Sequence, residues 1–147
     1  MAEAIFGLVG VIIGAVISGV INYVLQKRKE QMAARVAARL VREELYLVAV
    51  WVEDLLNQEN VGAEQFRKIK ARTGADAWPE QRIHLAAAMN YKAYADASMA
   101  VGAVYRFLFW LDTKENVNSL EDQDRILLQE ILERLRPGLE TLKDVAQ

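Results

Sequence analysis

The sequence contains no cysteine, and among its 147 residues it has only one histidine and two prolines. Without cysteine the chain can form no disulfide, thiolate nucleophile or thiolate metal site. Zinc needs at least three protein ligands, and no such spacing accompanies the single histidine, His84. The sequence therefore predicts no metal site.

Recognisable catalytic motifs are also missing. There is no Gly-rich phosphate loop, no dinucleotide-binding fingerprint and no paired-carboxylate motif in a recognisable context. Glu80 and His84 are four residues apart and could meet on one helix face, but no presented Ser or Cys completes a triad. We expect His84 to be structural or exposed. The sequence predicts a protein that is not an enzyme and that binds no cofactor.

Charge is absent from one long apolar segment near the N-terminus. Ala4 to Leu25 is a run of 22 residues without a charged side chain. As a helix this run would be about 33 Å long, whereas the hydrocarbon core of a bilayer is about 30 Å thick. The sequence therefore predicts a transmembrane span over residues 1–26, with one domain over residues 27–147.

Small or polar residues occupy one face of this predicted span. At about 100° per residue, they fall within a third of the helix circumference: Gly7, Gly10, Gly14, Ser18 and Asn22. Membrane helices associate through close approach at small residues and through hydrogen bonds between side chains. This glycine-zipper pattern predicts a homo-oligomer interface, although glycine is also frequent in membrane helices in general.

The flanks of the span predict its orientation. The N-terminal Met-Ala-Glu carries no basic residue, whereas Lys27, Arg28 and Lys29 follow the span directly. A cleaved signal peptide would have basic residues before a shorter apolar run. The positive-inside rule instead places Met1 outside and everything from Gln26 onward in the cytoplasm, and the expected membrane is a bacterial-type inner membrane. The three basic residues are expected to contact anionic lipid headgroups.

The remaining residues, about 120, suffice for one compact domain. Apolar spacing predicts helices over 26–57, 63–72 and 79–111, and Asp76 and Pro79 are expected to begin the third. A last helix is expected to be capped by Ser119. Pro137 and Gly138 should kink or break it, most simply into two segments packed along one line. Charged residues inside 79–111 argue against a second span. The predicted fold is all-α: a single transmembrane helix that continues into a cytoplasmic antiparallel helical bundle.

One stretch of the long first helix is apolar on all sides. Residues 45–52 read LYLVAVWV, which indicates a helix buried on more than one face or shared with another subunit. A short buried strand is the alternative. Five aromatic residues are expected in the core, with ligand stacking as the alternative role: Trp51, Trp78, Trp110, Phe107 and Phe109.

Basic side chains form two groups in the soluble part. The first group, on one side of the long helix, is Arg28, Arg35, Arg39 and Arg42, and the second is Arg67, Lys68, Lys70 and Arg72. The first group either pairs with the acidic helix at Glu130 and Glu133 or, from Arg35 onward, binds an anionic ligand. The second group is a further candidate for anion binding. No nucleic-acid motif accompanies either group, so nucleic acid is not the expected partner.

Two classes of function are consistent with these features. The protein could be a self-associating membrane scaffold or a pore-forming effector, with a pore lined by Ser18, Asn22 and Gln26. Alternatively, the helical domain could be a membrane-tethered binding module or sensor that captures a cytoplasmic protein or an anionic ligand. The expected partners are membrane lipids and further copies of the same chain.

Overall fold

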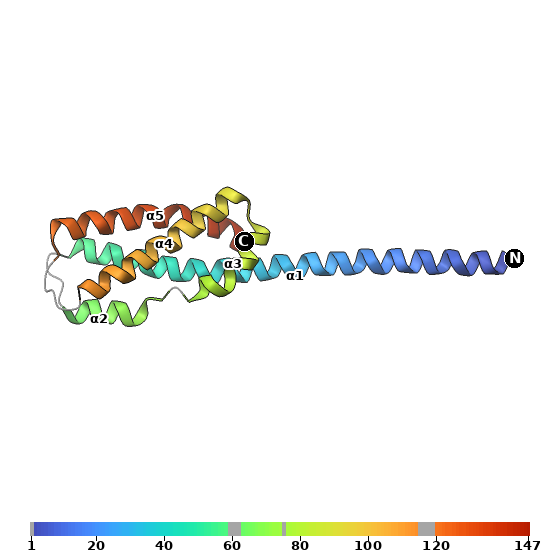
Figure 1. Cartoon of the computed structure of the whole chain (residues 1–147), viewed down its shortest axis with the longest axis horizontal. Coiled ribbons are helices and arrows are strands. Elements are labelled where there is room, and N and C mark those ends of the chain that lie inside the picture. The colour runs from blue at the N-terminus through green and yellow to red at the C-terminus, as the bar shows by residue number, and fades with distance from the viewer. Residues whose placement is uncertain (1, 59–62, 75, 115–119) are drawn as a thin grey trace. The chain divides into compact units, whose positions relative to one another are not determined.

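The computed structural model describes residues 2–58, 63–74, 76–114 and 120–147, with side chains from residue 11 onward except at 63. Within these ranges the chain is all-α and contains no strand. The helices are α1 (Ala2–Asn57), α2 (Ala63–Arg72), α3 (Ala77–Ala88), α4 (Tyr91–Thr113) and α5 (Asp122–Ala146) (Figure 1). The predicted fold class is confirmed, and residues 45–52 are helical, so the alternative of a strand is wrong.

The chain divides into two compact units, Met1–Ala33 and Ala34–Gln147. The first unit consists of the N-terminal part of α1, in which every residue from Val11 to Gln31 is exposed. By length and composition, α1 is long and apolar enough to cross a membrane, and its most apolar window has no buried residue. The uncharged apolar segment that predicts a span is therefore exposed from Val11 onward.

The second unit is a helical bundle around one apolar core. In Figure 1, α5 runs in the opposite direction to α4 and to the part of α1 that belongs to this unit. The predicted stripe of α1 faces the core, with each member at most 1% exposed: Ala37, Val41, Leu45, Val48, Val52 and Leu55. Opposite this stripe α5 contributes Leu128, Ile131, Leu135 and Leu142. On α5, three members of the predicted stripe are buried, whereas Leu132 and Leu139 are only partly buried and the buried Ile131 was not predicted.

The predicted helix over 79–111 is wrong, because the structure has two helices there, α3 and α4. The backbone is extended at Met89 and Asn90, and the Asn90 side chain accepts a hydrogen bond from the Ala93 N–H at 2.9 Å. Asparagine is a favoured N-cap residue, since its side chain satisfies an otherwise unpaired N–H of the first turn. The sequence on both sides of Asn90 is rich in alanine and favours helix, so Asn90 was not recognised as the N-cap of a new helix.

The predicted division into two segments at Pro137 is also wrong, because α5 continues through it as one helix. Proline removes one backbone hydrogen bond, which leaves the carbonyl of residue i−4 without its usual donor. That residue is Glu133, and both Pro137 and Glu133 are exposed, so water can hydrate the freed carbonyl. The apolar stripe on both sides of the proline then holds the helix in one piece.

The helix starts of the bundle differ in part from those predicted. Asp76 is the N-cap of α3 but makes no side-chain cap bond, and the Glu44 carboxylate instead accepts from the Ala77 N–H at 2.9 Å. Burial raises the pKa of Glu44, and this backbone bond offsets part of the increase. At the start of α5, Glu121 forms a capping box with Asp124. The predicted cap Ser119 lies outside the described residues.

Gly138 allows α5 to approach α4 closely. A Cβ atom built on Gly138 would overlap the Cβ of Ala100 and would lie 3.2 Å from the carbonyl oxygen of Asp96. Gly138→Ala should therefore cost about 1–3 kcal/mol in overpacking, offset by about 1 kcal/mol of improved helix propensity. We expect a net loss in the free energy of unfolding, measured by thermal or denaturant unfolding of the full chain in detergent.

Gly102 provides the matched control, because a Cβ built there meets nothing within 4 Å. Gly102→Ala, inside α4, should raise the free energy of unfolding by about 1 kcal/mol through helix propensity alone. If both alanine variants shift stability in the same direction, the close approach at Gly138 is not what determines the packing of α5.

Candidate functional site

The small-residue face of the first unit is exposed where the structure describes its side chains. Gly14, Ser18 and Asn22 are exposed, and a Cβ built on Gly14 meets no atom within 4 Å. Gly7 and Gly10 belong to the part of α1 for which only the backbone is described. No atom of the described chain covers Gly14, so any close packing there must come from lipid or from another chain.

The polar end of this segment makes contacts within its own helix. The side-chain amide of Gln26 donates to Glu30 at 3.0 Å, one turn further along α1. The predicted headgroup-contacting residues Lys27, Arg28 and Lys29 are all exposed. They are available to lipid, whereas Gln26, expected to line a pore, is hydrogen-bonded to an acidic side chain.

The arginines on the bundle part of α1 do not form the predicted ion pairs with Glu130 and Glu133. Glu130 of α5 pairs with Arg106 of α4 at 3.0 Å. Arg39 donates through Nε to the backbone carbonyl of Ala146 at 3.3 Å, in the last turn of α5, where helix carbonyls lack partners. Arg35 and Arg42 are exposed. Arg39 thus has a structural role, and its two neighbours stay candidates for anion binding.

The second basic group lies on α2 and is partly paired. Lys68 pairs with Glu64 at 2.8 Å within the helix, and Lys70 pairs with Asp112 of α4 at 2.8 Å. The hydrogen bond from Lys68, together with its charge, lowers the pKa of Glu64. Arg67 and Arg72 are exposed. Two of the four cations therefore have acidic partners, which weakens the group as an anion site.

Four of the five aromatic residues predicted for the core contribute to it. Phe107 and Trp110 are buried and stacked with their ring centroids 5.9 Å apart, and Trp51 and Trp78 are half-buried against the core. The prediction for Phe109 is wrong, since its side chain is 72% exposed on the outer face of α4. Sequence reasoning also missed Phe66, which is buried edge-on against Trp110.

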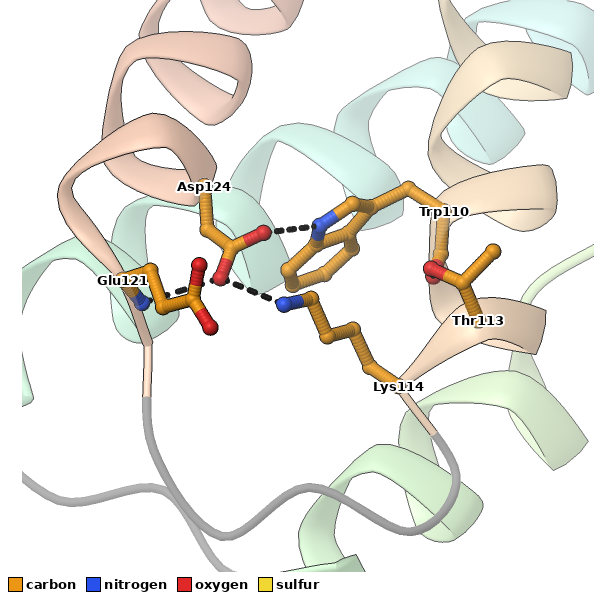
Figure 2. A network of polar contacts seen from close by, with 5 residues as sticks. All are labelled: Trp110, Thr113, Lys114, Glu121 and Asp124. Carbon is orange, nitrogen blue, oxygen red and sulfur yellow. Dashed lines mark hydrogen bonds and ion pairs between the residues drawn. The ribbon is translucent and has the colours of Figure 1, made fainter.

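A buried polar network joins the end of α4 to the start of α5, and Figure 2 shows its members. The Asp124 carboxylate accepts from Trp110 Nε1 at 2.8 Å and from the Glu121 backbone N–H at 2.9 Å. The Lys114 ammonium lies 2.7 Å from the same carboxylate, and both side chains are mostly buried. Every contact of Asp124 is with the bundle itself, so the network fixes the helix junction and offers no free group for chemistry.

A cavity of about 550 Å³ lies between the end of α1 and α5. Its lining is mostly polar and consists of Leu56, Asn57, Arg125, Gln129, Leu132, Glu133 and Arg136. Arg125 donates to the backbone carbonyls of Leu56 and Gln58, at 3.0 Å each. This guanidinium therefore caps the C-terminal end of α1. The sequence-predicted arginines do not line this cavity.

The described ranges hold no candidate metal site. His84 is exposed on α3. Nowhere among the described side chains do three or more His, Asp or Glu residues come together as metal ligands.

The stretch 45–52 has one buried and one exposed face. Leu45, Val48, Ala49 and Val52 are buried in the core, whereas Tyr46 is 61%, Leu47 38% and Val50 40% exposed. The stretch is thus not enclosed by its own chain on all sides. That another subunit covers the exposed face stays a prediction.

No protein family, curated protein or solved structure shows a significant match to this chain. The functional argument therefore rests on two features of the described structure. One is the exposed small-residue face of the first unit, and the other is the exposed apolar side of α1 in the second unit.

Proposed function

We propose that the protein is a single-span membrane scaffold that self-associates through Gly7, Gly10, Gly14, Ser18 and Asn22 and is not an enzyme. One observation carries the proposal: the apolar helix of the first unit is exposed along its whole described length. An exposed helix of this composition is costly in water and favourable in a bilayer. Within the bilayer, its small-residue face is the part best suited to close helix contact.

A scaffold accounts for the polar residues of the span better than a pore does. Only Ser18, Asn22 and Gln26 were candidates for a polar lining, and Gln26 is hydrogen-bonded to Glu30. We expect liposomes that contain the assembled wild-type chain to retain an entrapped dye. Release of the dye would instead favour the pore-forming effector.

A second candidate function is a membrane-tethered module that binds an anionic ligand. The cavity between α1 and α5 favours it, because Arg125 and Arg136 both line that cavity. Binding of inorganic phosphate or a nucleotide to the full chain in detergent, measured by calorimetry and reduced in an Arg136→Ala variant, would support this function. The scaffold proposal predicts no such binding.

The orientation of the span gives a separate prediction. Lys27, Arg28 and Lys29 stand on one flank only, so Met1 should lie outside the cytoplasm and Gln147 inside. Fusions of a cytoplasm-dependent reporter to the C-terminus should be active, and fusions of a periplasm-dependent reporter should be inactive. The reverse pattern would contradict the orientation and would remove the case for a cytoplasmic domain.

A further inference from the structure

The outer side of α1 in the second unit carries a row of residues at alternating steps of four and three. The row consists of Val36, Leu40, Glu43, Leu47 and Val50, and is called here the α1 row. At about 100° per residue its members span about 80° of the helix circumference. The four apolar members are 55%, 42%, 38% and 40% exposed, in chain order. Such a seven-residue repeat is the pattern with which one helix packs against another in a left-handed coiled coil.

We propose that the α1 row is the seam of a parallel homodimer, with a second copy of this chain as its partner. The inference rests on the proposed function, because chains inserted in one orientation begin their α1 helices from the same side of the bilayer. Parallel pairing would bring each apolar member of the row next to the same residue of the partner subunit. The α1 row would then be the soluble continuation of assembly that begins in the span.

The residues that flank the α1 row are complementary to themselves in this arrangement. In a parallel coiled coil, the residue just before every second seam position, here the one before Leu40 and the one before Leu47, faces the partner residue that lies five positions further along the chain. That rule places Arg39 opposite Glu44 of the partner subunit and Tyr46 opposite the partner subunit's Trp51. One pair is oppositely charged and the other is aromatic, so both favour a second copy over an unrelated helix.

The charged pair retains bonding capacity for such a contact. Arg39 uses Nε for the Ala146 carbonyl, and its terminal N–H groups make no hydrogen bond to any described residue. Glu44 uses Oε1 for the Ala77 N–H and also accepts from the Asp76 backbone, but an ionised carboxylate has about four acceptor sites in all. Both side chains are therefore held in place by their own chain and can still bond to a partner.

Glu43 limits the strength of the seam. It stands in the middle of the α1 row, so a parallel dimer brings two carboxylates together between the apolar members. Like charges that face each other oppose association. The seam is therefore expected to be weak by itself and to depend on the span, and removal of this charge should strengthen it.

The absence of native cysteine makes the full chain suited to single-cysteine crosslinking in native membranes. Val36→Cys and Val50→Cys should each form a disulfide with the same residue of the partner, because identical seam positions can reach the required Cα separation of about 4.4–6.8 Å. Phe109→Cys and Ile126→Cys are matched controls, because these residues are 72% and 58% exposed but lie on α4 and α5. They should crosslink little. Adding Glu43→Leu to Val50→Cys should increase the disulfide-linked dimer at least about threefold.

A Ser18→Cys variant reports association of the spans independently. If Ser18→Cys crosslinks while Val36→Cys and Val50→Cys do not, the proposed function stands and the seam is overturned. If none of the three crosslinks, both are overturned. A mixed disulfide between Val36→Cys and Val50→Cys chains would indicate antiparallel pairing and contradict the proposal. An adduct to a different protein, a dimer dominated by Phe109→Cys, or an unchanged yield with Glu43→Leu would also contradict it.

Discussion

Gly14→Leu is expected to weaken assembly in membranes at least about tenfold while the chain stays in the membrane. A leucine at a close helix crossing separates the backbones and removes the packing and weak hydrogen bonds between them. A loss of about 1.4 kcal/mol is sufficient for a tenfold change in association. A Cβ at this position meets no atom within 4 Å beyond the helix's own nearby backbone, so the described chain leaves room for a side chain there. The measurement is crosslinking in native membranes, with fractionation to confirm insertion.

Gly19→Leu is the matched control for this prediction. A Cβ on Gly19 also meets nothing within 4 Å, and the residue lies about 140° around the helix from Gly14. Both substitutions add the same apolar side chain and change helix propensity equally, so they differ only in the face that they occupy. If the two variants assemble alike, the small-residue face is not the interface and the α1 helices of the bundle must carry the assembly.

Asp124→Asn is expected to lower the free energy of unfolding by about 3 kcal/mol. The substitution leaves the mostly buried Lys114 ammonium without its carboxylate, and unpaired buried charges of this kind cost about 3–5 kcal/mol. Asp124 accepts from Trp110 Nε1, the Glu121 backbone N–H and the Lys114 ammonium. The asparagine amide replaces one accepting oxygen with an N–H₂ donor, so at least one of these donors loses its acceptor. Denaturant unfolding of the full chain in detergent measures the loss.

Two further variants serve as controls. Asp122→Asn tests the effect of removing a carboxylate from the start of α5, and Lys114→Met combined with Asp124→Asn tests the effect of the unpaired ammonium. Asp122 stands in the same first turn of α5 but is exposed, so its loss should cost only about 0.3–1 kcal/mol through the helix dipole. Adding Lys114→Met to Asp124→Asn removes the unpaired ammonium and should restore part of the lost stability. If Asp122→Asn costs as much as Asp124→Asn, the buried network is not the source of the effect.

The same network gives an acid-side pH dependence. Burial acts to raise the pKa of Asp124, but the bonds from Lys114, Trp110 and the Glu121 backbone outweigh it, so the pKa lies below its ordinary value of 3.8. A lowered pKa contributes stability above the unfolded-state value, and that contribution is lost as the pH falls through the folded-state value. Wild type should therefore lose stability below about pH 4. Asp124→Asn should lack this part of the loss.

The helices of the bundle could be predicted because the apolar spacing of three and four residues that indicates a helix also forms the face that packs in the core. The α1 stripe from Ala37 to Leu55 is both a sequence periodicity and the face of the core. Local signals were weaker guides. The Asn90 side chain caps the start of α4 inside one continuous helical pattern. Pro137 does not stop α5, where Pro137 and Glu133 are both exposed and Gly138 packs closely against α4.

Contacts between distant parts of the chain could not be read from spacing. Arg39 meets the carbonyl of Ala146, 107 residues away, and Arg125 caps the end of α1 from α5. The pairing of Glu130 with Arg106 depends on which faces of α4 and α5 meet, and that is set by the fold as a whole. Of the Asp124 network, only the capping box between Glu121 and Asp124 has a local sequence signal, an acidic pair three residues apart.

Self-association in a bilayer is the central claim, and the protein mass of the detergent-solubilised full chain tests it most directly. Sedimentation in a density-matched detergent reports that mass without the contribution of the micelle. For chains extracted from native membranes, the proposal predicts a multiple of the 16.6 kDa chain mass for wild type and for Gly19→Leu. Gly14→Leu should shift toward 16.6 kDa. A wild-type particle of a single chain mass, or recovery of the protein in the soluble fraction, would contradict the account.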